Sequence, residues 1–79
     1  MPRQFDTVAL GHRIRTTRKR ARLTQEQLAS MVGISLPFLG HVERGTRIPS
    51  AETLVSFANV LHVPVDFLLA DSLTYRIEE

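Results

Sequence analysis

The sequence predicts an all-α fold in which five short helices pack into one small domain. Apolar residues recur at three- and four-residue spacing along most of the chain, which is the pattern of helices with one buried face. Residues that favour helix ends separate these segments: Thr24, Ser35 and Ser50 suit N-caps, and Gly33 and Gly45 suit C-caps. A chain of 79 residues also has room for only one thin core.

We expect residues 1–79 to form this single domain, with a core over about residues 8–70 and a polar tail over 71–79. The chain has no cysteine, so neither disulfides nor thiolate-bound metals support the fold. No apolar stretch approaches the roughly 20 residues that a membrane span needs, and the N-terminus lacks a secretory signal pattern. These features predict a cytoplasmic protein.

The first two helices are expected over about residues 6–22 and 24–32. The first has one apolar side and another side crowded with arginine. Thr24 and Gln27 have the spacing of a capping box, which begins the second helix. Gly33 then ends that helix, because glycine adopts a positive φ angle at little cost.

A third helix follows after a tight turn, from the Ser35 cap to about Arg44. Pro37 lies in its first turn, where a missing N–H group costs nothing. Ala29 is expected at the point where the second and third helices cross, since a larger side chain would hold them apart. The apolar residues expected to fix this pair to a further helix are Leu28, Val32, Ile34, Leu39 and Val42.

Two more helices complete the predicted fold. In the loop over residues 46–49, Ile48 is expected to act as a buried apolar plug. Ser50 then caps a fourth helix with an apolar stripe. A short fifth helix is expected over about residues 64–70, and the β character of residues 74–77 is too brief to assign.

Charge is distributed unevenly along the chain. Nine basic and three acidic residues give residues 1–50 a net charge of +6, whereas one basic and five acidic residues give residues 51–79 a net charge of −4. A basic half of this kind suits a polyanionic partner. The alternative is an ordinary solvated helix face.

Four short motifs in fixed order and spacing carry a resemblance to a known family. They are Leu23-Thr24-Gln25-Glu26-Gln27-Leu28-Ala29, Gly33-Ile34-Ser35, Val42-Glu43-Arg44-Gly45 and Pro49-Ser50-Ala51-Glu52-Thr53-Leu54. With them the chain resembles the Cro/cI-type helix-turn-helix regulators, also called xenobiotic-response-element (XRE) regulators. The resemblance covers about residues 8–70, with the helix-turn-helix at 24–45, and implies a compact lambda-repressor-like domain of five helices.

The resemblance further implies a sequence-specific DNA-binding transcriptional regulator, either a repressor or an autoregulator. Its third helix would enter the major groove of double-stranded DNA. A homodimer would bind an inverted-repeat operator whose half-sites lie about one helical turn apart. No cofactor and no metal are expected.

The exposed side of the third helix, which would face the DNA, is expected to consist of Ser35, Leu36, Pro37, Gly40, His41 and Arg44. Many family members carry hydrogen-bonding side chains where this chain has Leu36, Pro37 and Gly40. The two apolar side chains suit thymine methyl groups, and Gly40 would let the backbone approach closely. His41 could donate to guanine N7 or O6. With so few direct contacts, DNA shape is expected to contribute to recognition.

Contacts to phosphates are expected on both sides of this helix. Gln25 opens the second helix, where family members often touch a phosphate and where the helix N-terminus favours an anion. Arg44, Thr46 and Arg47 surround the following loop and resemble phosphate clamps. A polar surface with no partner is the alternative for each of them.

The resemblance gives Arg18 and Glu43 a different role. The matching residues of the family usually pair across the first and third helices, and we expect this pair to fix the recognition helix against the core. The sequence does not decide how many of the remaining basic residues of the first helix reach DNA; they are Arg13, Arg15, Lys19, Arg20 and Arg22.

The dimer surface is expected near the C-terminus. Phe67, Leu69, Leu73 and Tyr75 are more apolar side chains than a short terminal helix needs for packing on a small core, so some could face a second subunit. The alternative is that all of them close the core of the monomer.

A second class of function remains open from the sequence. The apolar residues Leu36, Pro37 and Phe38 would also suit a protein-interaction adaptor, or an antitoxin-like partner protein, on the same fold. An enzyme is not expected, because Ser35, His41 and Glu43 fall on one helix without the geometry of a catalytic triad.

Overall fold

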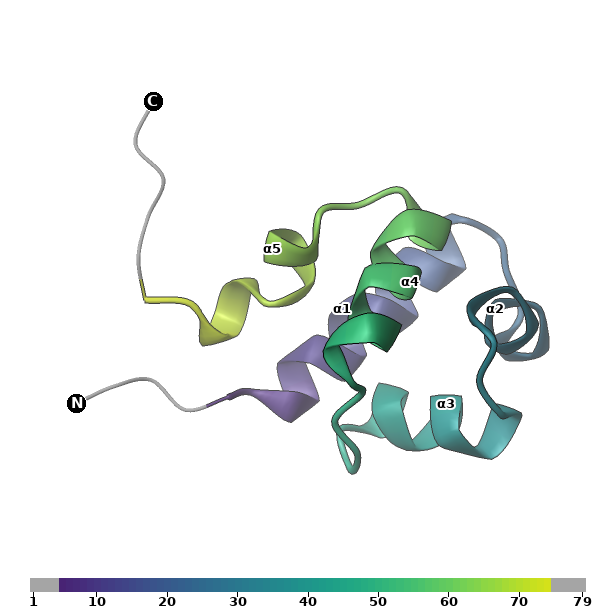
Figure 1. The fold of residues 1–79 in the computed structure, drawn as a ribbon, viewed down its shortest axis with the longest axis horizontal. Helices are drawn as coiled ribbons and strands as arrows, with labels where there is room; N and C mark the ends of the chain where they lie inside the picture. The colour runs from purple at the N-terminus through teal and green to yellow at the C-terminus, as the bar shows by residue number, and fades with distance from the viewer. Residues whose placement is uncertain (1–4, 75–79) are drawn as a thin grey trace.

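The structure is a computed structural model that describes residues 5–74, and that part of the chain is helical without any strand (Figure 1). The helices are α1 (Thr7–Arg20), α2 (Gln25–Val32), α3 (Leu36–Arg44), α4 (Ala51–Leu61) and α5 (Val65–Leu68), followed by a short 3-10 helix at Ala70–Ser72. The central helices α1 and α4 pack together, with α2 and α3 on one side and α5 on the other (Figure 1). The predicted all-α fold of five helices is confirmed.

The predicted helix caps are present. Gln27 N donates to Thr24 Oγ1 over 3.0 Å, and Thr24 N donates to Gln27 Oε1 over 2.9 Å, which completes the capping box. Ser35 Oγ accepts from the amide three residues later at the start of α3, and Ser50 Oγ does the same at α4. These local bonds satisfy amides that would otherwise lack partners, so they fix where each helix begins.

The first helix is shorter than predicted. Asp6 is its N-cap, and it ends at Arg20 rather than Arg22. Arg22 has a φ of 59°, and Leu23 N donates to Arg18 O over 3.1 Å. This is the pattern of a Schellman ending, in which a left-handed residue turns the chain away from the helix axis.

The core lies between α1, α4 and the helix-turn-helix pair. Its largest fully buried side chains are Phe57, Leu10, Ile14, Leu28, Leu39, Leu68 and Val42. Of the residues predicted to fix α2 and α3, Val32 and Ile34 are only partly buried, although both pack against this core. Ala29 is 3% exposed, in agreement with its expected place at the helix crossing.

The prediction for Ile48 is wrong. Its side chain is 58% exposed, whereas the adjacent Pro49 is buried. The loop between α3 and α4 therefore turns a proline, rather than the isoleucine, toward the domain. Neighbouring residues of a loop direct their side chains differently, and the sequence alone does not show whether Ile48 or Pro49 faces the domain.

The helices α1 and α3 approach each other closely at Gly11, a residue to which the sequence analysis gave no role. An ideal Cβ atom at this position would overlap the Val42 carbonyl oxygen and lie 2.6 Å from the Glu43 carbonyl oxygen. Only hydrogen fits between the two backbones. Gly11 therefore sets how deeply α3 seats against α1.

The C-terminal segment is anchored to α1. The predicted helix over 64–70 is divided in two, because the chain leaves the helical path at Leu69 and continues as the 3-10 helix. Arg13 forms an ion pair with Asp71, and the Arg13 guanidinium carbon lies 4.9 Å from the centre of the Phe67 ring. The hydrogen bond to Asp71 raises the pKa of Arg13 above its ordinary value, so its charge is retained throughout the neutral range.

Within residues 5–74, no helix is long and apolar enough to cross a membrane. The same residues contain no group of three or more histidine, cysteine, aspartate or glutamate side chains that could hold a metal ion.

Candidate nucleic-acid interface

The exposed face of α3 lies at one edge of the domain, with α2 beside its N-terminal end (Figure 1). Leu36, Pro37, His41 and Arg44 are exposed on it, as the sequence predicts. The opposite face contributes Leu39 and other buried residues to the core. The helix is therefore held by one side and leaves the other free for a ligand.

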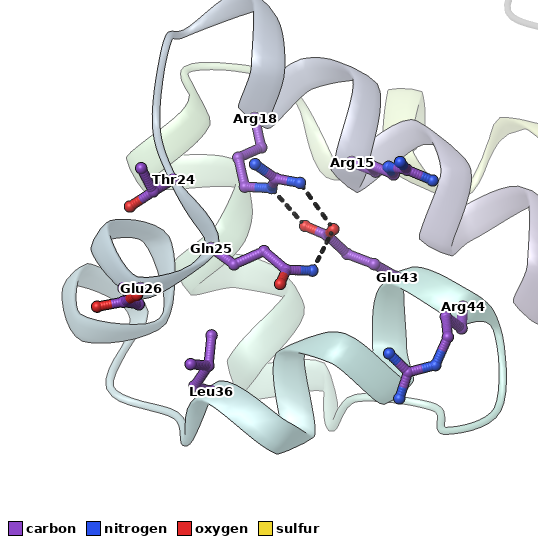
Figure 2. Close-up of a pocket in the computed structure, with 8 residues that line it drawn as sticks. All are labelled: Arg15, Arg18, Thr24, Gln25, Glu26, Leu36, Glu43 and Arg44. Carbon is purple, nitrogen blue, oxygen red and sulfur yellow. Dashed lines mark hydrogen bonds and ion pairs between the residues drawn. The ribbon is translucent and has the colours of Figure 1, made fainter.

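A buried polar network fixes α3 in this position (Figure 2). Arg18 Nε donates to Glu43 Oε2 over 2.7 Å, and Arg18 Nη2 donates to Glu43 Oε1 over 3.0 Å. Arg18 and Glu43 are only 8% and 7% exposed. This bidentate pair joins α1 to α3, which is the contact that the family resemblance implied.

Gln25 extends the network to α2. Its Nε2 donates to Glu43 Oε1 over 3.0 Å, so the first residue of α2 is tied to the last turn of α3. One hydrogen of Nε2 is used in this bond, so the second Nε2 hydrogen and the backbone amide are the donors left for the phosphate contact expected of Gln25. The hydrogen bond makes Gln25 part of the support for α3 as well, which the sequence analysis missed.

The prediction that Gly40 is exposed is wrong. Gly40 is buried although it belongs to the outward side of α3. Its cover is the Arg44 side chain, since Arg44 Nη1 would lie 3.0 Å from a Cβ atom at Gly40. Sequence periodicity places the two residues on one helix face but cannot show that the longer side chain lies over the glycine.

His41 is tied to the loop after α3. Thr46 Oγ1 donates to the His41 carbonyl oxygen over 3.1 Å, and the same Oγ1 lies 3.0 Å from His41 Nδ1. A hydroxyl group has one hydrogen, so a Thr46 hydroxyl that donates to the carbonyl must accept from Nδ1. In the tautomer whose Nδ1 carries the hydrogen, Nε2 is an acceptor, whereas the guanine donor expected from the sequence requires a hydrogen on Nε2.

Basic and polar groups border α3 on both sides. Thr46 and Arg47 are exposed in the loop before α4. On the other side is a hollow of about 610 Å³ between α1, α2 and α3 (Figure 2). Arg15, left open by the sequence analysis, lines this hollow together with Gln25 and Arg44. Three helices thus bring cationic and amide groups to one open cleft.

The structure describes three of the four residues expected at a dimer surface. Phe67, Leu69 and Leu73 are half-buried, with Phe67 beneath the Arg13 guanidinium. Tyr75 lies outside the described residues. Phe67 and Leu69 pack against the core, and all three described side chains retain exposed apolar surface.

Comparison with known proteins also identifies a helix-turn-helix domain in this chain. The helix-turn-helix family model matches residues 14–68. An uncharacterized HTH-type transcriptional regulator of Bacillus subtilis, YazB, is 47% identical over 58 residues, which are 73% of this chain and 84% of YazB. The chain spans only 41% to 48% of the length of three further curated relatives, which are also described as HTH-type transcriptional regulators.

Two solved structures are similar over most of this chain. The restriction-modification controller protein C.AhdI from Aeromonas hydrophila has a TM-score of 0.76 and 35% identity, with 80% of this chain and 96% of that chain covered. The P22 c2 repressor of a Salmonella phage, solved in complex with a synthetic operator, has a TM-score of 0.75 and 34% identity, with 78% and 94% covered. The chain therefore belongs to the Cro/cI-type helix-turn-helix family of transcriptional regulators.

Proposed function

We propose that this chain is a sequence-specific DNA-binding transcriptional regulator that inserts α3 into the major groove, as a repressor or autoregulator. The observation that carries the proposal is the division of α3 into two faces. Its inner face is fixed by the Arg18–Glu43 pair and the core, and its outer face exposes Leu36, Pro37 and His41. A rigid helix with a free outer face is what major-groove reading requires.

The groups beside α3 support contacts to the DNA backbone. Arg47 lies on one side, and Arg15 and the N-terminus of α2 at Gln25 lie on the other. The amide and the hydroxyl of Thr46 both donate to the His41 carbonyl, so Thr46 supports the loop instead. Phosphates flank the major groove on both sides, so this arrangement would position α3 over the base edges. Ser35 Oγ accepts from the Phe38 amide, and its hydroxyl hydrogen is left to donate to a phosphate or a base.

A homodimer on an inverted-repeat operator is part of the proposal. The half-buried Phe67, Leu69 and Leu73 would supply apolar surface for the second copy, together with Tyr75. Dimer symmetry would place two copies of α3 in successive major grooves. A protein partner other than a second copy would compete for exposed apolar residues such as Leu36, and is the alternative that the experiment below addresses.

Catalysis forms no part of the proposal. Glu43 is buried beneath Arg18 and Gln25, and the Ser35 hydroxyl caps α3. Neither side chain is oriented toward the His41 ring, which contacts Thr46 instead. These three residues therefore do not form a nucleophile, base and orienting acid.

The test is selection of the purified chain against a random duplex DNA library, followed by salt titration on the enriched sites. We expect an inverted repeat whose affinity falls steeply between about 50 and 200 mM salt. Arg47→Ala should lower affinity for every sequence and reduce the salt slope by about one. The adaptor function is correct instead if no DNA sequence is enriched, and if binding of a protein partner is lost on Leu36→Glu but is unaffected by Arg47→Ala.

A further inference from the structure

The Arg44 side chain occupies the place where residue 40 would carry its own side chain. A Cβ atom built on Gly40 would lie 3.0 Å from Arg44 Nη1, 3.5 Å from Nη2 and 3.6 Å from Cζ. All three nearest atoms belong to one guanidinium group. Arg44 is exposed while Gly40 is buried, so the guanidinium lies on the outer surface of α3, one turn before its own Cα atom.

This guanidinium is not neutralised within the described part of the chain. Residues 5–74 contain two ion pairs, Arg13–Asp71 and Arg18–Glu43, and neither involves Arg44. The adjacent Glu43 carboxylate points inward and accepts from Arg18 and Gln25. Figure 2 shows Arg44 directed along α3 toward Leu36, away from the Glu43 contacts. No ion pair within residues 5–74 therefore competes with a DNA base for the Arg44 guanidinium.

Position 40 lies on α3 one turn after Leu36 and one turn before Arg44, and both of these residues are exposed. Leu36 and Pro37 offer no hydrogen-bond donor, and Gly40 has no side chain. The Arg44 guanidinium over residue 40 supplies a pair of N–H donors that the other side chains of this face lack. Two parallel N–H groups match guanine O6 and N7 in the major groove.

We propose that Arg44 is a specificity-determining residue that reads a guanine at the base pair facing residue 40, and that Gly40 is the residue that gives the guanidinium room to do so. The inference rests on the proposed DNA-binding function. It replaces the phosphate clamp that the sequence suggested for Arg44, while Arg47 keeps that role. A side chain at residue 40 would push the guanidinium off the helix and alter the base read there.

The experiment measures binding to the operator selected by the wild-type chain and to its single-base-pair variants. The proteins are wild type, Arg44→Lys, Gly40→Gln and the control Arg47→Ala, each checked for helical content and thermal unfolding. Arg44→Lys keeps the charge but not the fork. We expect it to retain the salt slope and lose about 5- to 150-fold discrimination at one G·C pair, the range of a bidentate arginine–guanine contact.

Gly40→Gln should change the preference at that same base pair, because the amide side chain displaces Arg44 and suits adenine. Arg47→Ala should weaken binding to all sequences by one common factor. The inference is overturned if Arg44→Lys lowers binding to every variant equally, since that is the behaviour of a phosphate contact. It is also overturned if Gly40→Gln leaves all base preferences as in wild type.

The two proposals fail in different ways. A wild-type chain that enriches no operator contradicts the DNA-binding function, and the role of Arg44 falls with it. A wild-type chain that enriches an operator, with base preferences insensitive to Arg44→Lys and Gly40→Gln, contradicts the role of Arg44 alone.

Discussion

Gly11 in α1 and Val42 in α3 approach so closely that a Cβ atom on Gly11 would overlap the Val42 carbonyl oxygen. The clash is with backbone rather than with a flexible side-chain end, so α3 would have to move as a unit to relieve it. The position of the recognition helix therefore depends on a glycine that carries no functional group.

Replacing Gly11 with alanine should reduce the free energy of unfolding by at least about 1–3 kcal/mol, the usual cost of overpacking. Urea denaturation followed by circular dichroism would measure the change. Gly40→Ala is the matched control, because its new methyl group meets only the movable end of Arg44. Alanine in a helix interior is favoured by about 0.5–1 kcal/mol, so this control should be neutral or stabilising. Equal effects of the two substitutions would contradict the close approach.

The Arg18–Glu43 pair is predicted to be essential for stability. Arg18→Ala leaves the Glu43 carboxylate buried with Gln25 as its remaining described partner, and the expected loss is about 3–5 kcal/mol. A loss of that size is comparable with the whole stability of a small domain. Arg18→Lys should therefore be measured alongside, since it keeps the charge without the two-bond fork and should unfold at an intermediate urea concentration.

Arg15→Ala is the control for that comparison, because Arg15 lies on the same helix and is exposed. Its expected change in unfolding free energy is within about 0.5 kcal/mol. A stability of Arg18→Ala close to that of Arg15→Ala would show that the buried pair contributes little.

The Thr46 hydroxyl is predicted to set which base His41 recognises. While Thr46 accepts from Nδ1, a neutral His41 offers Nε2 as an acceptor, which suits the amino group of adenine or cytosine. Thr46→Val removes that restriction, so the preference at one base pair should broaden. His41→Ala should abolish the preference at the same pair. Selection from a random library reports both, and a guanine preference at the base whose selection His41→Ala abolishes would refute the assigned hydrogen-bond directions.

Leu73→Glu is predicted to weaken self-association. Leu73 is half-buried near the end of the described chain and close to the proposed dimer surface. A carboxylate there would have to be desolvated in a dimer, at a cost of several kcal/mol. Analytical ultracentrifugation over a range of concentrations measures the association. Met31→Glu is the control, since Met31 is 57% exposed on α2 at the opposite side of the domain (Figure 1). If both variants associate as the wild type does, the surface is misplaced.

The starts of α2, α3 and α4 were predictable because they depend on neighbours in the sequence. The Thr24 capping box and the Ser35 and Ser50 caps use hydrogen bonds across three residues, so residue type and spacing are sufficient. Gly33 and Gly45 likewise have φ angles of 83° and 79°, as their places after helices suggest.

The misplaced residues depend on contacts between distant parts of the chain or on side-chain conformation. Whether Ile48 or Pro49 is buried depends on how the loop meets the domain. Gly40 is covered because the long Arg44 side chain turns back over it, and spacing alone allows that side chain several directions. Gly11 stands out only when α1 and α3 are seen together.

The hydrogen bond from Asp6 N to Ser72 Oγ, 2.8 Å long, joins positions 66 residues apart. Together with the Arg13–Asp71 ion pair, it holds the two ends of the described chain close together. This proximity suits a circular permutation of residues 5–74, in which a short linker joins residue 74 to residue 5 and new termini open in a loop elsewhere. Backbone cyclisation at this point would restrict the unfolded chain while demanding little rearrangement of the folded one.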